Sequence, residues 1–355
     1  MQTQRRWAIG LMVAALALVS GCPNRLPTDP GETVAALIFA LVPEGQEVGI
    51  IDLRVNRLAT ALSAGGVPSG LAVTPYGRLL LISNETTHTV RTYQQRDYGL
   101  YNPLGDIGVG RNPQQIVMNA PAKEAVVAVA GDRRIAVVDV SLPRDRPTLK
   151  GIAPMSDVPV GVAVSSDGAV TVAVSATQLY RVQRSSAGVY TAAAVTLPTA
   201  TDRRLVSVAM WRDQSVLVDA QRNEMLIVAA DGTARTVDLK RNGQAAQPGK
   251  VIVNLQGTKL YVACPGTNTI AVVDPAAGTV LQHAELGSAV AMPFGLAVTP
   301  DGTRLYASMQ VGRQLAIFDT SPDPAVTTSL NKAIGLSSSA GGQVPLSEIV
   351  IARPE

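Results

Sequence analysis

The apolar residues of this chain fall into short runs separated by turn residues, which is the pattern of β-strands. The segment 293–319 shows it most clearly, with an apolar run, a Pro300-Asp301-Gly302 turn, a second run at 304–308 and a third at 314–319. Asp-Gly between two short apolar runs is a strong hairpin signal, because glycine reaches positive φ without strain. A fourth, weaker strand fits before the next unit, for example at 279–285. No unit shows a convincing apolar stripe of helical period, so we expect helices to be minor.

The same unit repeats along the chain and begins with proline. Six prolines open it, at spacings of 45, 46, 89, 45 and 52 residues: Pro68, Pro113, Pro159, Pro248, Pro293 and Pro345. Proline suits the first residue of a strand, where its missing N–H is not yet needed. The 89-residue gap holds two periods, and the spacing predicts the missing copy at Arg203. Repeats of this length indicate a solenoid or a propeller, and four-stranded units indicate propeller blades.

The two ends of the chain complement each other. Segments 34–42 and 48–53 match the second and third strands of a unit, without a proline-led first strand before them. Segment 345–351 is a first strand that lacks its successors. We therefore predict an all-β fold over 34–355, a seven-bladed β-propeller of four-stranded antiparallel blades, closed by the C-terminal strand pairing into the N-terminal blade. Closure also removes the exposed strand edges that invite aggregation.

Three stretches carry a resemblance to a known family. Residues 258–263, 268–274 and 296–306 resemble the YVTN-type β-propeller repeat, and its eponymous segment reads Tyr261-Val262-Ala263-Cys264 here. The resemblance covers 34–355, is strongest in the last two complete units and is degraded at 203–229. It implies relatives that include lactone hydrolases and lyases with sites at the mouth of the central channel.

The first 21 residues read as an export signal. Arg5 and Arg6 give a positive start, residues 8–19 are apolar, and Cys22 follows Ser20-Gly21. This apolar stretch is short for a membrane span, which needs about 20 residues, but suits a secretory signal. Residues 18–22 resemble the bacterial lipobox, which implies cleavage of 1–21 and lipidation of Cys22. The alternative is an ordinary cleaved signal with an incidental cysteine.

Residues 22–33 then form a lipidated cysteine and a proline-rich tether. The eleven residues after Cys22 reach at most roughly 35–40 Å, so we expect the propeller at or near a membrane surface. The resemblance to Gram-negative lipoproteins implies transport to the outer membrane, because Pro23 rather than aspartate follows the cysteine. The predicted location is the cell envelope, with the lipid as the membrane contact.

The composition of the chain argues against several classes of function. The formal charge of +3 falls to +1 without Arg5 and Arg6, and no concentrated basic stripe indicates a nucleic-acid partner. Only two histidines occur, His88 and His283, which argues against multi-copper sites and paired haem ligands. We find no known zinc, serine-nucleophile, phosphate-loop or calcium motif and expect no cofactor, no metal and no catalytic residue. Lipidation of Cys22 leaves Cys264 alone, without a disulfide framework, as a small residue at a strand end.

Loops on rigid scaffolds carry function, and in propellers these are the loops between second and third strands and the linkers between blades. Alignment on Asn268 places seven residues at one equivalent position: Gln46, His88, Arg133, Thr177, Asn223, Asn268 and Arg313. The linkers add Arg111, Asp157, Asp202, Arg203 and Arg204. These residues are either solvated loop charges and turn-capping asparagines or a recognition surface for an anionic or polar partner. Aspartates at third-strand ends, such as Asp139 and Asp274, are expected to cap turns.

The leading hypothesis is a non-enzymatic, lipid-anchored binding or scaffold module for a protein, a polysaccharide or another polar envelope ligand. The alternative is a lactonase-like hydrolase or lyase at the channel mouth, with His88, Glu85 and the arginines as candidates. A redox accessory subunit is a third possibility, which the two histidines support poorly. A concave pocket around His88, or a carboxylate held by arginine, would favour the enzyme. A flat or apolar-ringed face would favour a protein partner.

Overall fold

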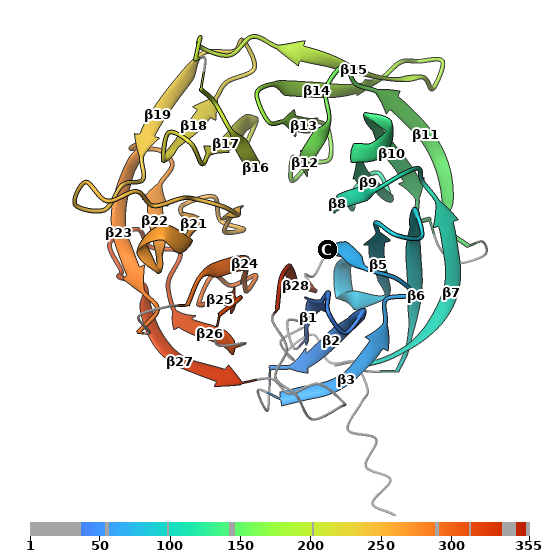
Figure 1. The fold of residues 1–355 in the computed structure, drawn as a ribbon, viewed down its shortest axis with the longest axis horizontal. Helices are drawn as coiled ribbons and strands as arrows, with labels where there is room; N and C mark the ends of the chain where they lie inside the picture. The colour runs from blue at the N-terminus through green and yellow to red at the C-terminus, as the bar shows by residue number, and fades with distance from the viewer. Residues whose placement is uncertain are drawn as a thin grey trace, which may run out of the picture.

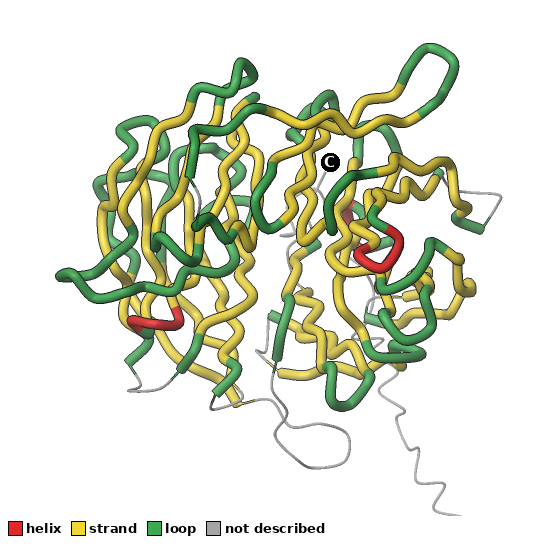
Figure 2. Tube along the Cα trace, turned by 45° about the horizontal axis from the view of Figure 1, so that its top comes forward, coloured by secondary structure: helices red, strands yellow, loops and turns green. Residues whose placement is uncertain are grey.

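The computed structural model describes residues 37–53, 57–97, 99–141, 146–200, 202–287, 291–311, 314–335 and 346–352. Their 28 strands form seven four-stranded antiparallel sheets around a common axis (Figure 1). Helix is confined, in this part of the chain, to the single turns Pro75–Gly77, Ala130–Asp132 and Pro265–Thr267 (Figure 2). The predicted all-β, seven-bladed propeller is confirmed.

We number the blades in chain order and give the strands of each blade from the innermost, nearest the axis, to the outermost. They are, in blade 1, β28 (Ile349–Ile351), β1 (Leu37–Val42), β2 (Glu47–Asp52) and β3 (Arg57–Ser63); in blade 2, β4 (Pro68–Val73), β5 (Leu79–Asn84), β6 (Thr89–Asp97) and β7 (Leu100–Gly108); in blade 3, β8 (Pro113–Asn119), β9 (Glu124–Val129), β10 (Arg134–Asp139) and β11 (Thr148–Pro154); in blade 4, β12 (Pro159–Val164), β13 (Thr171–Ser175), β14 (Leu179–Arg184) and β15 (Tyr190–Val195); in blade 5, β16 (Leu205–Trp211), β17 (Gln214–Asp219), β18 (Glu224–Val228) and β19 (Ala234–Asp238); in blade 6, β20 (Val251–Val253), β21 (Leu260–Cys264), β22 (Thr269–Asp274) and β23 (Thr279–Glu285); and in blade 7, β24 (Pro293–Val298), β25 (Arg304–Met309), β26 (Gln314–Asp319) and β27 (Ser329–Gly335).

The ring is closed by the last strand. β28 pairs antiparallel with β1, with Ile38 opposite Ile351 and Ala40 opposite Ile349. The pairing continues beyond β28, because the Ser347 N–H donates to the carbonyl of Leu41 at 3.0 Å. The predicted closure is therefore confirmed. The predicted signal at 1–21, the tether at 22–33 and the lipidation site Cys22 lie outside the described residues.

The blades are held together by apolar contacts between their faces. Every residue of β1 is buried, and Ile38 packs in one cluster with Leu315 of blade 7 while Phe39 packs in another with Leu80 of blade 2. Both faces of an inner strand therefore meet a neighbouring blade, which explains the nearly continuous apolar runs of Val, Ala and Leu. The core is divided into such clusters between neighbouring blades.

Glycine in the innermost strand lets neighbouring blades approach closely. A Cβ on Gly295 would lie 2.3 Å from the carbonyl oxygen of Ser347, just before the closing strand, and one on Gly70 would lie 2.5 Å from that of Gln114 in blade 3. The Ser308 hydroxyl uses the same gap and donates to the Ser347 carbonyl at 2.5 Å. The Pro-x-Gly start of these strands thus serves the contact between blades as well as the strand itself.

A charged pair ties blade 6 to the closing strand. Lys250 Nζ and Glu348 Oε1 lie 2.6 Å apart, and both side chains are about one-sixth exposed, at 16% and 15%. Each residue stands one place before Val251 or Ile349, which begin the strand pairing of their blades. The equivalent residue of blade 7, between them, is Gly295, which precedes Leu296. The ion pair therefore spans blade 7 at a place where blade 7 has no side chain.

Blade 5 corrects one sequence prediction. Its pairing of Leu205 with Asp219 corresponds to that of Pro68 with Asn84 in blade 2. Leu205, and not Arg203, therefore occupies the place of the missing proline. The difference arises because blade 4 ends in a long linker, residues 196–204, which shifts the start of the next strand.

Replacing Gly295 by alanine is expected to lower the free energy of unfolding by about 1–3 kcal/mol, because the added Cβ collides with backbone that cannot rotate away. Gly108 is the matched control, since a Cβ added there would have nothing within 4 Å and its φ is not positive. Urea denaturation of Gly295→Ala and Gly108→Ala compares the two. Equal stability of the two variants would contradict the close approach at the closing strand.

Candidate functional site

The loops that carry the predicted site share one face of the ring. Each first strand starts at the linker from the preceding blade and the second strand returns, so linkers and second-to-third-strand loops lie together. We call this the rim face; in blades 1, 2, 3, 5 and 6 its loops are 43–46, 85–88, 130–133, 220–223 and 265–268. β1 runs towards the rim face and β28 runs away from it. Leu37 and Ile351 therefore both lie on the opposite face.

Five of the seven aligned residues adopt one unusual backbone conformation. Each is the last residue of its loop and is left-handed, with φ of 50° at Gln46, 63° at His88, 49° at Arg133, 57° at Asn223 and 50° at Asn268. The carbonyls of Gln46, His88, Arg133 and Asn223 receive the N–H that follows the fourth strand, for example Ala64 to Gln46 at 2.7 Å and Leu239 to Asn223 at 2.9 Å. This position thus fixes where each outer strand turns inwards.

The side chains at this position also hold the next blade in place. Asn223 Oδ1 accepts the N–H of Gln247 at 2.7 Å, and Asn268 Oδ1 accepts that of Met292 at 3.1 Å. His88 Nδ1 accepts the N–H of Asn112 in the same way, at 3.3 Å. All three donors immediately precede a strand-opening proline. His88 therefore has the same acceptor role as the two asparagines, through the lone pair of Nδ1.

Two aligned residues stand apart. Thr177 lies in blade 4, whose hairpin is two residues shorter, because Ala173 pairs with Tyr180 whereas Ile82 pairs with Arg91 in blade 2. Thr177 is not among the residues with positive φ, so its alignment with the others was wrong. Arg313 lies outside the described residues.

The arginines of the rim face divide into paired and unpaired groups. Arg111 Nε donates to Asp132 Oδ1 at 2.7 Å, and this hydrogen bond holds the pKa of Asp132 below its usual value. Arg133 and Arg204 are exposed, and neither has an ion-pair partner among the described residues. Among the described arginines of the rim face, Arg133 and Arg204 are therefore without an ion pair, and so is the exposed Lys240 in the linker before β20.

Arg203 is buried rather than displayed. Its side chain is 5% exposed, that of Asp219 is 0% exposed, and Nε lies 3.6 Å from Oδ2. The other oxygen of Asp219 accepts three backbone N–H groups, from Arg204, Gln221 and Arg222, at 3.1–3.2 Å. The carboxylate thus organises the start and the loop of blade 5. Asp202 nearby pairs with Arg222 at 2.9 Å, which lowers the pKa of Asp202.

The enzyme candidates do not form a catalytic pair. Glu85 is half-buried, and its N–H donates to the Val67 carbonyl at 3.1 Å. No hydrogen bond or ion pair between described residues joins its carboxylate to His88. Asp157 lies in the linker before β12, as predicted, and its carboxylate accepts the hydroxyl of Tyr180; burial together with this bond raises the pKa of Tyr180. Sequence reasoning did not find Tyr180, since its place became apparent only through the shortened hairpin.

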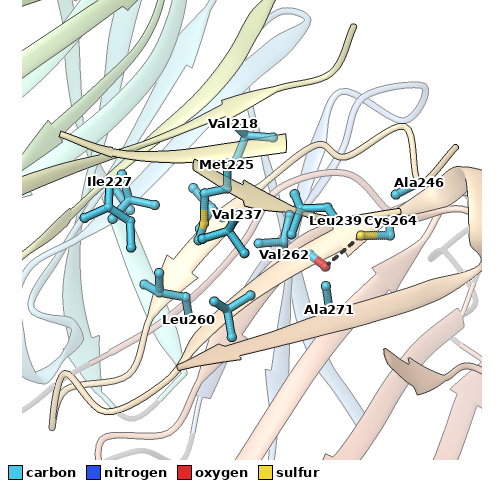
Figure 3. Close-up of a cluster of buried hydrophobic side chains, with 14 of the residues drawn as sticks. Val218, Met225, Ile227, Val237, Leu239, Ala246, Leu260, Val262, Cys264 and Ala271 are labelled. Atoms are coloured by element: carbon cyan, nitrogen blue, oxygen red, sulfur yellow. Dashed lines mark hydrogen bonds between the residues drawn. The ribbon is translucent and has the colours of Figure 1, made fainter. Parts of the chain in front are cut away.

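The remaining reactive side chains are embedded in the blades. Cys264 ends β21 within an apolar cluster that includes Val262, Met225 and Ala271 (Figure 3). Burial raises the pKa of its thiol to about 12, and its role as a small strand-end residue is confirmed. His283 is half-buried in β23, where burial lowers its pKa. Nowhere in the described ranges do three His, Cys, Asp or Glu residues gather as metal ligands would.

Apolar side chains stand exposed on the rim face of blade 7. Met292, Phe294 and Val311 are 40%, 43% and 41% exposed. Their segments are joined by backbone hydrogen bonds, from Gln310 to Met292 at 3.2 Å and from Val311 to Ala291 at 3.3 Å. We call these three side chains the blade 7 patch. Phe294 is the second residue of the innermost strand β24, so the patch includes residues of the loop, the linker and the innermost strand.

The exposure of Phe294 is exceptional within this chain. The chain has three phenylalanines, and the other two, Phe39 and Phe318, are completely buried. The residue after the strand-opening proline is Ser69 in blade 2, Gln114 in blade 3 and the half-buried Val160 in blade 4. An exposed aromatic residue at this place was the available signal for the blade 7 patch, and the predicted site did not include it.

Comparison with known proteins identifies the fold. No family model matches the chain, and no curated protein matches its sequence. A functionally unknown protein from Desulfotomaculum acetoxidans DSM 771 is similar in structure, with a TM-score of 0.73 at 12% identity over 90% of this chain and 100% of that one. The periplasmic gluconolactonase PpgL of Pseudomonas aeruginosa has a TM-score of 0.70 at 16% identity, over 89% of this chain and 98% of that one. Hydrazine synthase of Kuenenia stuttgartiensis has a TM-score of 0.68 at 18% identity, over 82% of this chain and 94% of that one.

These neighbours share the propeller fold. At such low identities they establish nothing further, because propellers host unrelated functions. The resemblance to the YVTN repeat stays a prediction. Within the described residues, no helix has both the length and the apolar character needed to cross a bilayer.

The acceptor role of His88 predicts a specific pair of outcomes. His88→Asn is expected to keep the stability of the protein within about 0.5 kcal/mol, because asparagine tolerates the left-handed conformation and can accept the same N–H. His88→Ala is expected to lose about 1 kcal/mol with the hydrogen bond. Urea denaturation of both variants measures this. Equal losses in the two would show that the acceptor is not what matters.

Removing the buried carboxylate of Asp219 is expected to lower the free energy of unfolding by more than the His88 substitutions do. Asp219→Ala leaves Arg203 buried without its counter-charge and frees three backbone donors, which should reduce the free energy of unfolding by about 3 kcal/mol or more. Glu285→Ala is the control, because Glu285 is 64% exposed where it pairs with Arg241, and such pairs contribute at most about 1 kcal/mol. In thermal denaturation, the melting temperature of Asp219→Ala should lie well below that of Glu285→Ala.

Proposed function

We propose that this chain is a lipid-anchored binding module of the cell envelope, with a protein as the partner of its rim face. The lipobox resemblance at residues 18–22 supports the anchor, and the absence of a recognised catalytic motif supports a non-enzymatic role. Pro23 after the cysteine supports the outer membrane as the location. Once lipidated, the chain would need no spanning segment to remain at the membrane.

The observation that carries the protein-binding role is the exposed blade 7 patch. Interfaces between proteins concentrate their binding energy in apolar and aromatic side chains at the centre, with polar groups around them. The rim face has this composition, since exposed apolar residues lie near the axis and the cations Arg133 and Arg204 lie on other blades. The geometry at His88 supports the same choice, because its imidazole Nδ1 is already engaged by the Asn112 N–H.

A lactonase-like activity is the second candidate. It is supported by the similarity in fold to the gluconolactonase PpgL, although at 16% identity. In this chain the carboxylate of Asp157, held by the hydroxyl of Tyr180, is the polar group on the rim face that could face a small substrate. An assay of the purified protein with gluconolactone tests this activity. Turnover abolished by Asp157→Asn would favour the enzyme, and turnover at the uncatalysed rate would exclude this substrate.

Thiol titration of protein purified from membranes tests the anchor. The native protein is expected to show no reactive thiol, because Cys264 is buried and its pKa is raised to about 12. In denaturant we expect one thiol per chain, from Cys264, because the sulfur of lipidated Cys22 is a thioether. The variant Cys264→Ser should then show none. Two thiols per denatured chain would mean that Cys22 is not lipidated.

The partner can be sought by affinity purification of the lipidated protein from solubilised membranes. Reproducible recovery of the same envelope protein, and its loss when the rim face is altered, is the expected result. Recovery of no partner, together with catalytic turnover, would reject the binding module in favour of the enzyme.

A further inference from the structure

The blade 7 patch is exposed on the rim face, opposite the face on which Leu37 lies. We propose that it is the anchoring point for a single partner protein, which inserts an apolar side chain beside Phe294 and places carboxylates opposite Arg133 and Arg204. This inference rests on the proposed function, since it takes the lipid anchor as given. It adds which part of the rim face binds, and what chemistry the partner must present there.

The course of the chain argues against the membrane as the occupant. Fourteen residues separate Cys22 from Leu37, and they reach at most roughly 46–50 Å when fully extended. Leu37 lies on the face opposite the rim. To turn the rim face to the bilayer, the tether would have to pass β2 and β3, which are about 4.8 Å apart, and then climb a strand of roughly 20 Å and its loops. That path consumes most of its reach, so the rim face is expected to point away from the lipid.

Side-chain exposure argues for a protein rather than a sugar or a small anion. Phe294, Met292 and Val311 present two aliphatic side chains and one aromatic ring, all about two-fifths exposed. None of these three side chains can donate a hydrogen bond to a hydroxyl or a phosphate. Their gain on binding comes from removing apolar surface from water, which requires an apolar group on the partner.

Charge completes the description of the partner. Arg133 is in the loop of blade 3 and Arg204 precedes β16 of blade 5, and both are exposed without an ion-pair partner in the described part of the chain. The nearby Arg111 and Arg222 are already paired with Asp132 and Asp202. A partner with carboxylates opposite these two unpaired arginines would match them, and the exposed Lys240 in the linker before β20 is likewise without an ion pair in the described part of the chain. Such charges contribute mainly to the association rate and to the orientation of the complex.

The opposite face supplies a matched control. Leu255 is 54% exposed in the turn between β20 and β21 of blade 6, on the side from which the tether departs. It resembles Phe294 in exposure and apolar character, and it differs in which face it occupies. Substitutions at the two positions therefore separate a specific surface from general hydrophobicity.

The test places a photo-crosslinking phenylalanine analogue at position 294, 255 or 133 of the full chain in living cells. We expect a discrete adduct with one other protein from positions 294 and 133, and none from 255. The partner, once identified and purified, should bind Phe294→Glu at least tenfold more weakly than it binds the wild-type protein. Its affinity for Leu255→Glu should equal its affinity for the wild type. Thermal denaturation checks that both variants are folded. Raising the salt concentration should slow association with the wild type more than with Arg133→Ala.

Other outcomes overturn the proposal. Adducts from 294 with lipid, or with a second copy of this chain, would assign the patch to the membrane or to self-association. An affinity unaffected by Phe294→Glu would remove the patch from the interface. An adduct from position 133 without one from 294 would leave the binding module intact and reject only the blade 7 anchor. No adduct from either position would count against the binding module itself.

Discussion

The hydrogen bonds between β28 and β1 convert a row of seven sheets into a ring, and the contact of blade 7 with blade 1 depends on them. Without β28, the inner edge of β1 would present unpaired backbone groups close to the axis, where a buried polar group is costly. The three paired positions of β28 are few for this task. The structure adds to them the approach of Gly295 to Ser347 and the ion pair of Glu348 with Lys250, which bind the closing strand to blades 7 and 6. The closing strand is thus held by contacts to blades 7 and 6 in addition to its pairing with β1 of blade 1.

The regular position at the end of the second-to-third-strand loop shows how a structural role can resemble a binding site. Gln46, His88, Arg133, Asn223 and Asn268 form a ring of polar residues on one face, as a recognition surface would. In four of these blades the carbonyl, and in three the side chain, is hydrogen-bonded to the linker that follows. The backbone conformation selects the residue type here, because asparagine is favoured in the left-handed region. The surface that we propose for binding instead contains Phe294, an aromatic residue at a place where blades 2 and 3 have Ser69 and Gln114.

Much of the architecture could be read from the sequence, because each blade repeats the same proline, the same hairpin turn and the same apolar runs. The prediction failed where two changes compensated each other. Blade 4 loses two residues from its hairpin at Thr177 but has a long linker, so the spacing between Pro159 and Pro248 stayed at two periods and concealed the shift. The sequence also could not distinguish buried Arg203 from exposed Arg204, since their difference depends on the position of Asp219 in the folded blade.

Placing both ends of the described chain on one face has a practical effect on how the protein can be handled. Ala352 follows β28 on the same side as Leu37, so a group attached at this end of the described chain would lie on the face opposite the rim face. A propeller immobilised in this way would leave its rim face accessible. Material added in the loop at 310–311, by contrast, would stand beside Val311 and shield the blade 7 patch.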